Sequence, residues 1–450
     1  MRADYYKINL FFLLTFLFAV FRYALPNALA EEETKGTAKI LPKYLTEAFS
    51  WDLRVLPYAI IQEPANSTQN PGNNVLKLPH YSTNLELRPD LRFKTDVLEL
   101  LAKPRLKLGI DYWQEGIRRG EKQENDDAYI NEWLARWKAR DNLFISYGRE
   151  NLQWGPSYLF SPSNPFHQDN GRRNPYQEVS GTDFGRMVWL PTSTLTLSLI
   201  ANTEEGRNKQ PGPDPFEKIY ACKVDYSGRE NYGSLILSQS EYGRSSLGYF
   251  GGWTVSDAVL LYGEGVFSRG SKALYARQDG SPLGSTFQKL RQDDPSFVPT
   301  LLAGGAYTFE SKGTLTLEYT YYGPGLSTGE ADPYYALRRR AADAFSAGGG
   351  LSGLGKLTLG QAANTGLRFL RKNYALVQYA QQNIYNRLDL TLRWTQNLDD
   401  ASCQFTSLVT YSLGNHWELF SVATVNGGNK DSEFGSLLDY QWMVGVQYTF

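Results

Sequence analysis

The last eleven residues of the chain read Tyr440-Gln441-Trp442-Met443-Val444-Gly445-Val446-Gln447-Tyr448-Thr449-Phe450. Large apolar side chains occupy every second position of this stretch, and mostly polar or small residues lie between them. Side chains of an extended strand point alternately to opposite faces, so a period of two indicates a β-strand with one apolar face.

The same alternation recurs along the chain, and residues 85–97 show what its second face must contact. Leu85, Leu87, Leu91 and Phe93 share one face of this predicted strand. The opposite face carries six charges, on Glu86, Arg88, Asp90, Arg92, Lys94 and Asp96. Charges in this number face neither lipid nor a dry core, so the pattern predicts a strand between lipid and a water-filled lumen.

Composition agrees with a β-rich membrane protein. The 450 residues include 30 Tyr, 41 Gly and 10 Trp but only 2 Cys. Lys and Arg number 46 against 47 Asp and Glu, a formal net charge of −1. Nucleic-acid binding, which needs a basic face, is therefore not expected.

The N-terminal thirty residues have the pattern of a secretory signal peptide. Arg2 and Lys7 precede an apolar run over 10–21, and Ala28 and Ala30 frame a small-residue cleavage site. A membrane anchor is the alternative, but the run is shorter than the roughly 17 residues a spanning helix needs. We expect a signal peptide over 1–30, a periplasmic segment over 31–48 and a barrel over 49–450.

Eighteen strands are predicted, and their connections alternate in length. They cover 49–61, 82–98, 104–113, 128–139, 143–148, 183–191, 194–201, 218–226, 231–239, 245–254, 257–267, 300–310, 313–322, 373–381, 386–396, 402–412, 416–426 and 437–450. Tight turns alternate with mostly long loops, as in outer-membrane barrels. The sequence therefore predicts an all-β fold, a transmembrane antiparallel up-and-down barrel of about 18 strands (16 to 20), with long extracellular loops partly folded into the lumen. A propeller would show repeats of similar length, and none is evident.

The chain end also resembles the C-terminal strand signature of bacterial outer-membrane β-barrel proteins. The resemblance lies in alternating residues that end in a terminal aromatic: Tyr440, Trp442, Val444, Val446, Tyr448 and Phe450. It implies an integral protein of a Gram-negative outer membrane, in contact with lipid and lipopolysaccharide. It also implies that the barrel-assembly machinery reads these six residues.

A second resemblance lies at Gly148-Arg149 followed by Trp154-Gly155-Pro156 and Asn164-Pro165-Phe166. These segments are similar to parts of alginate-export-type and capsule-assembly barrels, and imply a role with surface polysaccharide. The same glycines and prolines also suit a loop turn without any ligand, so that interpretation stays open.

Charged residues of the loops and of the predicted inner wall are the candidate solute contacts. Candidate pore residues in the loops are Arg149, Glu150, Trp154, Asn164, Arg172, Arg173, Arg338, Arg339 and Arg340. Candidate lumen-lining residues are Glu86, Arg88, Asp90, Arg92, Lys94, Glu132, Arg136, Glu318, Asp389 and Arg393. The arginines of the two long loops are candidates for an anion-preferring constriction, although loop charges are commonly just solvated.

The sequence allows two placements of the Arg149 side chain. It shares the parity of Ile145 and Tyr147, which points it toward lipid, where an Arg at the midplane costs about 2–4 kcal/mol. Either a bulge at Gly148 shifts the phase, or Arg149 lies near the rim.

Catalytic and metal chemistry is not indicated. The histidines at 80, 167 and 416 lack metal-ligand spacing, and no catalytic motif surrounds them. We expect no enzyme activity, no metal site and no cofactor.

The sequence thus predicts a porin-like channel for polar or anionic solutes, with a link to polysaccharide export. Two alternatives remain: a plugged barrel that binds or organises surface polysaccharide without transport, and a barrel sheath around a partner protein.

Overall fold

The structure is a computed structural model that describes residues 48–207 and 216–450. Residues 51–450 form one compact unit. The expected signal peptide over 1–30 and nearly all of the segment 31–48 lie outside the described residues. Among the helices described, none has the length and apolar character needed to cross a membrane.

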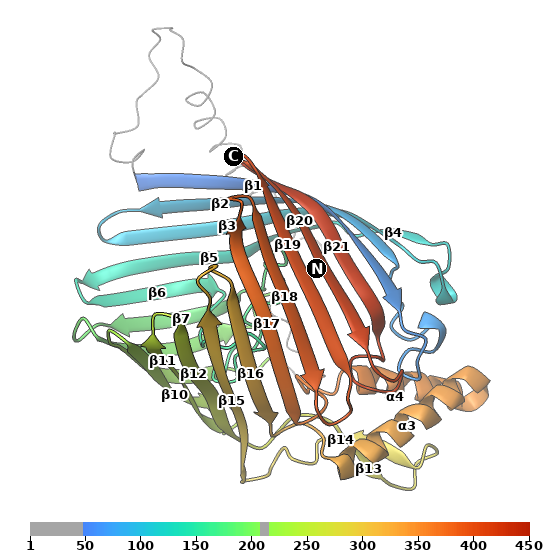
Figure 1. Ribbon diagram of the computed structural model, residues 1–450. Helices are drawn as coiled ribbons and strands as arrows, with labels where there is room; N and C mark the ends of the chain where they lie inside the picture. The colour runs from blue at the N-terminus through green and yellow to red at the C-terminus, as the bar shows by residue number, and fades with distance from the viewer. Residues whose placement is uncertain (1–47, 208–215) are drawn as a thin grey trace, which may run out of the picture. The chain divides into compact units, whose positions relative to one another are not determined.

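The compact unit is a closed antiparallel barrel of 18 strands. Each wall strand pairs with the next along the chain, and β21 returns to pair with β1, so that Arg54 lies opposite Thr449 (Figure 1). The wall strands are β1 (Phe49–Pro64), β2 (Tyr81–Lys94), β3 (Leu98–Tyr112), β5 (Asp127–Arg140), β6 (Leu143–Glu150), β7 (Thr182–Trp189), β8 (Leu195–Glu204), β9 (Ile219–Ser227), β10 (Asn231–Ser240), β11 (Ser245–Ser256), β12 (Val259–Arg269), β15 (Phe297–Thr308), β16 (Thr314–Tyr322), β17 (Asn373–Ile384), β18 (Leu388–Asn397), β19 (Cys403–Leu413), β20 (Trp417–Gly427) and β21 (Leu438–Thr449). The short β4 (Lys122–Glu124) extends β3 beyond the wall.

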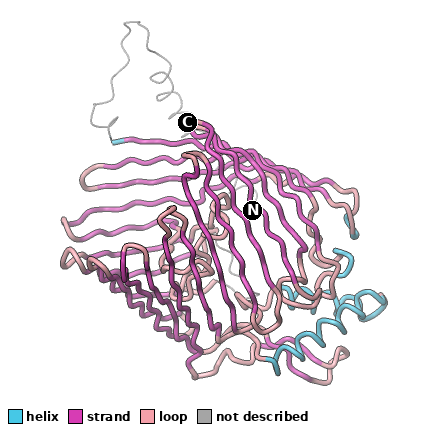
Figure 2. Tube along the Cα trace, viewed as in Figure 1, coloured by secondary structure: helices cyan, strands magenta, loops and turns pink. Residues whose placement is uncertain are grey.

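Tight turns and longer loops alternate as the sequence predicted. Turns such as 141–142 and 257–258 join strands at one end, which we call the turn end. Connections such as 151–181 and 323–372 lie at the other, the loop end. Helices α3 (Thr328–Ala347) and α4 (Ser352–Ala363) gather at the loop end (Figure 2).

One turn is misplaced by the sequence prediction. A turn over 99–103 was expected, but β2 ends at Lys94 and β3 begins at Leu98. Thr95 decides the position, because its hydroxyl accepts a 3.0 Å hydrogen bond from the Leu98 backbone N–H. The alternating charges mislead here, since Asp96 belongs to the turn and the strand face ends at Lys94.

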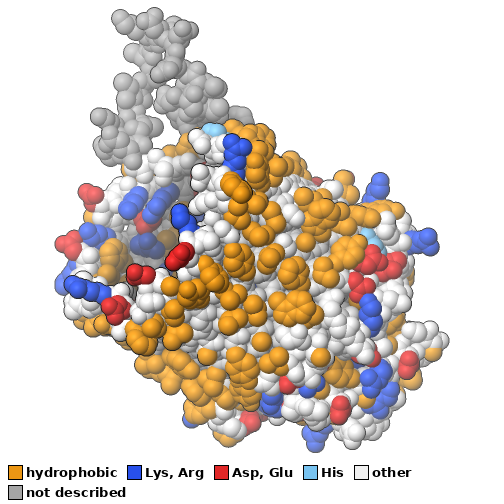
Figure 3. All heavy atoms as spheres, in the orientation of Figure 1, with side chains coloured by type: hydrophobic (Ala, Val, Ile, Leu, Met, Phe, Trp, Pro, Cys, Tyr) orange, Lys and Arg blue, Asp and Glu red, His pale blue; other side chains and the backbone are white. Residues whose placement is uncertain are grey.

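The outer wall is apolar. Trp253, Trp394, Trp417 and Trp442 are all exposed on it, near strand ends. Hydrophobic side chains cover the visible flank, whereas charged ones gather where the surface is hollowed at one end (Figure 3). Closure pairs the edge strands, so the backbone satisfies its hydrogen bonds without water.

A second core covers the loop end, and we call it the cap. It joins α3, α4 and the hairpin of β13 (Tyr275–Gln278) and β14 (Ser285–Gln288). Leu337, Leu359 and Tyr275 are among its buried residues. Ser327 and Glu330 start α3 with a capping box.

Candidate functional site

The barrel interior is crossed by the segment between β6 and β7, residues 151–181, which we call the inner loop. At its middle, Phe166 packs edge-on against Phe184 of β7, with ring centroids 5.0 Å apart. Further along, Asn174 lies 3.4 Å from the sulfur of Met443 on β21. The inner loop therefore contacts strands on both sides of the lumen and narrows it.

Local side-chain hydrogen bonds shape the inner loop. The amide oxygen of Asn164 accepts hydrogen bonds from the backbone N–H groups of Phe166 and His167, both 3.1 Å, and its NH2 donates to Leu152 O. Arg172 donates to the carbonyl oxygens of Ser157 and Gly155. Both predicted site residues thus brace the loop itself, Asn164 through an Asx turn and Arg172 through hydrogen bonds from its guanidinium to backbone carbonyls.

A carboxylate of the wall anchors the inner loop at β12. Glu264 is 0% exposed and accepts hydrogen bonds from Ser157 Oγ (2.9 Å), Ser163 Oγ (2.7 Å) and Ser163 N (3.2 Å). A buried carboxylate is costly unless its oxygens find donors, and here the inner loop provides them.

A second carboxylate anchors the loop at β16. Glu318 accepts hydrogen bonds from the backbone N–H groups of Tyr158 (2.6 Å) and Leu159 (3.0 Å). The hydroxyl of Tyr262, on β12, donates to the same carboxylate at 2.7 Å. The predicted lumen residue Glu318 thus holds the constriction in place.

The far end of the inner loop is bound to the opposite side of the barrel. Tyr176 stacks on Phe420 of β20, with centroids 3.8 Å apart and planes 13° from parallel. Arg88 donates to Tyr176 O at 2.8 Å, and Arg105 binds both oxygens of Glu178. Anchors on β12, β16, β20, β2 and β3 therefore surround the constriction.

Most predicted lumen-lining residues form ion pairs or hydrogen bonds along the inner wall. Their partners are as follows: Glu86 with Arg88 and Tyr58, Asp90 with Arg54 and Arg105, Arg92 and Arg136 with Glu99, Glu132 with Lys103, Asp389 with the backbone N–H of Asn383, and Arg393 with Gln378. Lys94 is exposed at the end of β2. Paired charges brace the wall and keep the lumen polar.

One cavity departs from this pattern of pairing. It measures about 120 Å3, and three arginines line it: Arg173 of the inner loop, Arg368 ahead of β17, and Arg393 of β18. Arg173 donates to Gln404, and Arg393 to Gln378, both neutral groups. Within salt-bridge range among the described residues, the three arginines have one carboxylate oxygen, that of Asp169, 3.9 Å from Arg368.

The environment of this cavity is strongly cationic. The acid in the lining is Glu433, from the loop between β20 and β21, and burial raises the pKa of its carboxyl to about 7. Asn397 and the backbone N–H of Leu370 donate to Glu433, at 2.8 Å and 3.0 Å.

The other predicted loop residues lie apart from this cavity. Arg149 binds Asp183 at 2.7 Å. The strand register runs through Gly148 without a shift, so there is no bulge at Gly148. Of the two expected placements of Arg149, the one near the rim is therefore confirmed. Glu150 pairs with Arg186 at 3.0 Å. Trp154 packs edge-on against Phe166, with the ammonium of Lys223 5.3 Å from its ring.

Arg338, Arg339 and Arg340 belong to the cap and do not join Arg172 and Arg173. Arg338 is 1% exposed and donates to Asp431, whereas Arg339 is 53% exposed. Arg340 donates to Ser285 of β14. The physical reason is the helix: successive residues of α3 point in different directions, so the three cations cannot share one face.

The sequence reasoning missed Glu264, Arg368 and Glu433. Glu264 lies between Gly263 and Gly265 on a predicted strand, at a position whose side chain points to the lumen. This single acidic residue could have been recognised from the sequence as a lumen residue. Arg368 and Glu433 come from loops, whose paths no periodicity predicts. Among the described residues, no group of histidine, cysteine or acidic side chains has the arrangement of a metal site.

Comparison with known proteins identifies the fold. No protein-family model matches the chain, and no curated protein matches it. The solved structure of the outer membrane protein OprD from Pseudomonas aeruginosa matches with a TM-score of 0.53 at 10% identity, over 90% of this chain and 94% of that chain. The chain has the fold of OprD.

Two further structures agree with this one. OccK11 (OpdR) from Pseudomonas aeruginosa matches with a TM-score of 0.52 at 12% identity, over 90% of this chain and 96% of that one. OccAB3 from Acinetobacter baumannii gives 0.51 at 10%, over 90% and 99%. The fold and the apolar wall together are those of an outer-membrane protein, as the sequence predicted. The resemblance to alginate-export and capsule-assembly barrels finds no support in these comparisons.

Proposed function

We propose that this protein is an outer-membrane channel for small polar solutes that prefers anions. The observation that carries the proposal is the cavity where Arg173, Arg368 and Arg393 meet. Among the described residues, the one carboxylate within salt-bridge range of these arginines is that of Asp169, 3.9 Å from Arg368. Arginines elsewhere on the inner wall, such as Arg88 and Arg105, have carboxylates within hydrogen-bond distance. Guanidinium groups that outnumber the nearby carboxylates in a confined polar space attract anions.

Passage would be diffusion through a constriction. The wall charges keep the lumen wet, and the inner loop sets its width. Arg173 belongs to the inner loop and Arg393 belongs to β18, so the position of the inner loop sets the distance between these two cations. Conduction requires that such a site bind weakly enough to release the solute, and a site built from separated guanidinium groups meets this need.

The test is the reversal potential of single channels in a salt gradient. The variants Arg173→Gln, Arg368→Gln and Arg393→Gln each remove one cavity charge, and Arg393→Lys keeps it. Arg92→Gln is the matched control, because it removes an arginine that binds Glu99. We expect anion preference to fall in the three cavity variants and to return in Arg393→Lys. A cation-selective wild-type channel, or an equal shift in Arg92→Gln, would overturn the proposal.

The inner loop also supports a second candidate function. Its anchors on opposite sides of the barrel favour a plugged barrel that binds solute without transport. A folded protein that never conducts, yet binds small anions in solution, would favour this candidate over the channel.

Polysaccharide export and a sheath around a partner protein both need a wide lumen. The inner loop crosses that space and is tied to the wall by Glu264 and Glu318. We therefore propose a small solute in preference to a polymer or a protein.

A further inference from the structure

The cavity lined by Arg173, Arg368 and Arg393, which we call the arginine cavity, has more hydrogen-bond donors than protein acceptors. Arg393 donates through Nε and Nη2 to Gln378, and its Nη1 donates to none of the described residues. Arg173 donates through Nη2 to Gln404, and its Nε and Nη1 have no acceptor in the same part of the chain. These N–H groups are available to a solute.

Arg368 is the least satisfied of the three arginines. Its Nε is buried and has no hydrogen-bond partner among the described residues. The Asp169 carboxylate lies 3.9 Å from its Nη2, which is longer than a hydrogen bond. A buried N–H without an acceptor is unfavourable, and an anion bound in the cavity would provide the acceptor.

A neutral donor completes the set. Thr395 follows Arg393 by two positions on β18, so both side chains point to the same face of the strand. Thr395 lines the cavity and is 5% exposed, and its hydroxyl makes no hydrogen bond to the described residues. Donors therefore reach the arginine cavity from β18, from the inner loop and from the segment ahead of β17.

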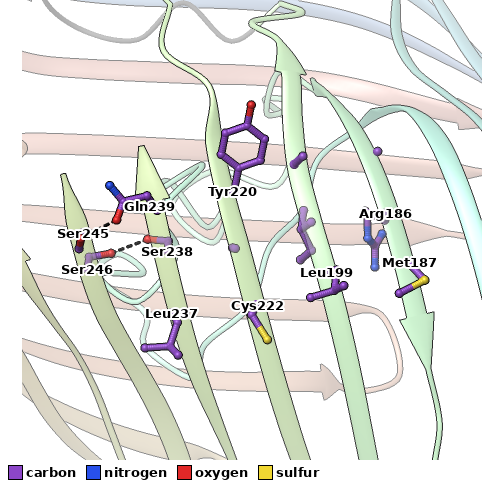
Figure 4. Close-up of a pocket in the computed structure, with 14 residues that line it drawn as sticks. Arg186, Met187, Leu199, Tyr220, Cys222, Leu237, Ser238, Gln239, Ser245 and Ser246 are labelled. Atoms are coloured by element: carbon purple, nitrogen blue, oxygen red, sulfur yellow. Dashed lines mark hydrogen bonds between the residues drawn. The ribbon is translucent and has the colours of Figure 1, made fainter. Parts of the chain in front are cut away.

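The size of the arginine cavity limits the anion. Its volume of about 120 Å3 is room for about four waters of about 30 Å3 each, and so for an anion of about five non-hydrogen atoms. Pockets for larger organic ligands commonly measure about 300–1,000 Å3. The barrel has a larger hollow, of about 900 Å3, on the outer wall over β7 to β11 (Figure 4). Exposed Met187, Leu199 and Leu237 line that hollow and face lipid, so it does not lie on the path of a solute.

Charge favours a dianion. The acid in the lining, Glu433, is bound by the neutral donors Tyr374 and Asn397, and burial raises the pKa of its carboxyl to about 7. Below that pH, the three guanidinium cations have the Asp169 carboxylate as their one anionic neighbour within salt-bridge range among the described residues. An anion with two charges compensates the remainder, whereas an anion with one charge leaves part of it unpaired.

The distribution of donors favours a tetrahedral anion. One guanidinium can bind both oxygens of a planar carboxylate in a bidentate pair. The oxygens of a sulfate or phosphate point to the corners of a tetrahedron, so they can accept hydrogen bonds from several separate groups at once. Phe369 and Phe434 form an apolar part of the lining, where a lower dielectric strengthens these attractions.

We propose that the arginine cavity binds a small tetrahedral oxyanion of the sulfate and phosphate class. Arg173, Arg368 and Arg393 bind its oxygens, and the hydroxyl of Thr395 is a fourth donor. This proposal rests on the proposed function, because it names the solute class of the same site.

The test is the block of single-channel chloride current by a second anion at about pH 6, where Glu433 is neutral. Sulfate and inorganic phosphate are the probes, and acetate, a planar monoanion, is the comparison. We expect one or both probes to halve the current at a concentration about tenfold lower than acetate. Because a hydrogen bond from a charged group is lost, Arg368→Gln should weaken the block by the oxyanion about tenfold.

Thr395→Val removes a hydroxyl donor without changing charge, and it should weaken oxyanion block while leaving acetate block unchanged. Two variants are matched controls: Arg54→Gln removes an inner-wall arginine that binds Asp90 at 3.1 Å, and Thr316→Val removes a buried hydroxyl on β16. Equal weakening of the block in Arg368→Gln and Arg54→Gln would show that the overall charge of the lumen sets the block, and would overturn the site.

Failure of the oxyanion site and failure of the channel give different results. An anion-selective channel that acetate and the two oxyanions block equally would overturn the site and leave the anion channel standing. A silent or cation-selective channel would overturn the proposed function, and isothermal titration calorimetry of the full protein would then decide the site. Binding of sulfate or phosphate about tenfold tighter than acetate would support the site, and equal or absent binding would overturn it.

Discussion

The carboxylate of Glu264 on β12 accepts a 2.7 Å hydrogen bond from the hydroxyl of Ser163 on the inner loop. This contact joins residues 101 positions apart in the chain. Ser157 binds the same carboxylate, so two points of the inner loop share one anchor in the wall. The position of the constriction is therefore set by the wall as well as by the loop sequence.

Replacing Glu264 by Ala should loosen the inner loop. The variant loses three hydrogen bonds worth about 1 kcal/mol each, so backbone amides of residues 155–164 should exchange about 10- to 100-fold faster. Hydrogen exchange by mass spectrometry checks this, and single-channel noise should rise with it. Glu132→Ala is the control, because Glu132 binds Lys103. Unchanged exchange in Glu264→Ala would show that the anchor is dispensable.

Tyr176 should close the constriction on the β20 side. Tyr176→Ala removes the stack on Phe420 and the hydrogen bond to Glu418, whereas Tyr176→Phe keeps the stack. Conductance should rise in the alanine variant and change little in the phenylalanine variant. Tyr249→Ala, on the lipid-facing wall, serves for comparison. A conductance that drops in Tyr176→Ala would contradict this role.

Anion preference should depend on pH through Glu433. Burial raises the pKa of its carboxyl from 4.5 to about 7, so the group is neutral below that pH and negative above it. The cavity of Arg173, Arg368 and Arg393 is then more positive at low pH, and anion selectivity should rise as pH falls through about 7. Reversal potentials measured across this range provide the test, and Glu433→Gln should flatten the profile.

The same shift sets a direction for stability. Because the folded state holds its proton to higher pH than the unfolded state, the stability linked to Glu433 is full below about pH 4.5 and falls as pH rises through about 7. Loss of the loop-end structure on acidification, rather than on alkalinisation, in a manner that Glu433→Gln removes, would contradict the assignment.

Arg338 should hold the cap together. It donates to Asp431 Oδ1 (3.0 Å), to Asp431 O (2.7 Å) and to Thr68 (3.1 Å). Hydrogen bonds from a charged group are worth about 1.5–3 kcal/mol, so Arg338→Met should speed amide exchange in α3 at least tenfold. Arg339→Met, an exposed change one residue along, should leave the exchange rate as it is. Similar rates in both variants would rule out a structural role for Arg338.

The barrel was predictable because its signals are local. Alternation at Leu85 or Tyr440 reports the period of a single strand, and turn residues between such strands set the strand order. The one misplaced turn, at Thr95, shows the limit: a hydroxyl that caps a turn is a stronger local determinant than a run of alternating charges.

The candidate site was only partly predictable, because long-range contacts decide it. Glu318 and Arg393 lie at alternate strand positions whose side chains point to the lumen, and this alternation is visible in the sequence. Arg173 and Arg368 have no such marker, and the arginines of α3 were expected near them but lie in the cap.

By itself, the sequence determined a membrane-spanning antiparallel barrel with a charged interior and an apolar wall. The tertiary structure decided where the inner loop runs, which arginines meet in one cavity, and where the wall is hollowed. The physical reason is the separation along the chain between the residues that interact. The two faces of a strand can be recognised from the alternation of neighbouring residues. The path of a loop depends instead on distant partners such as Glu264, which lies 101 residues from the serine it binds.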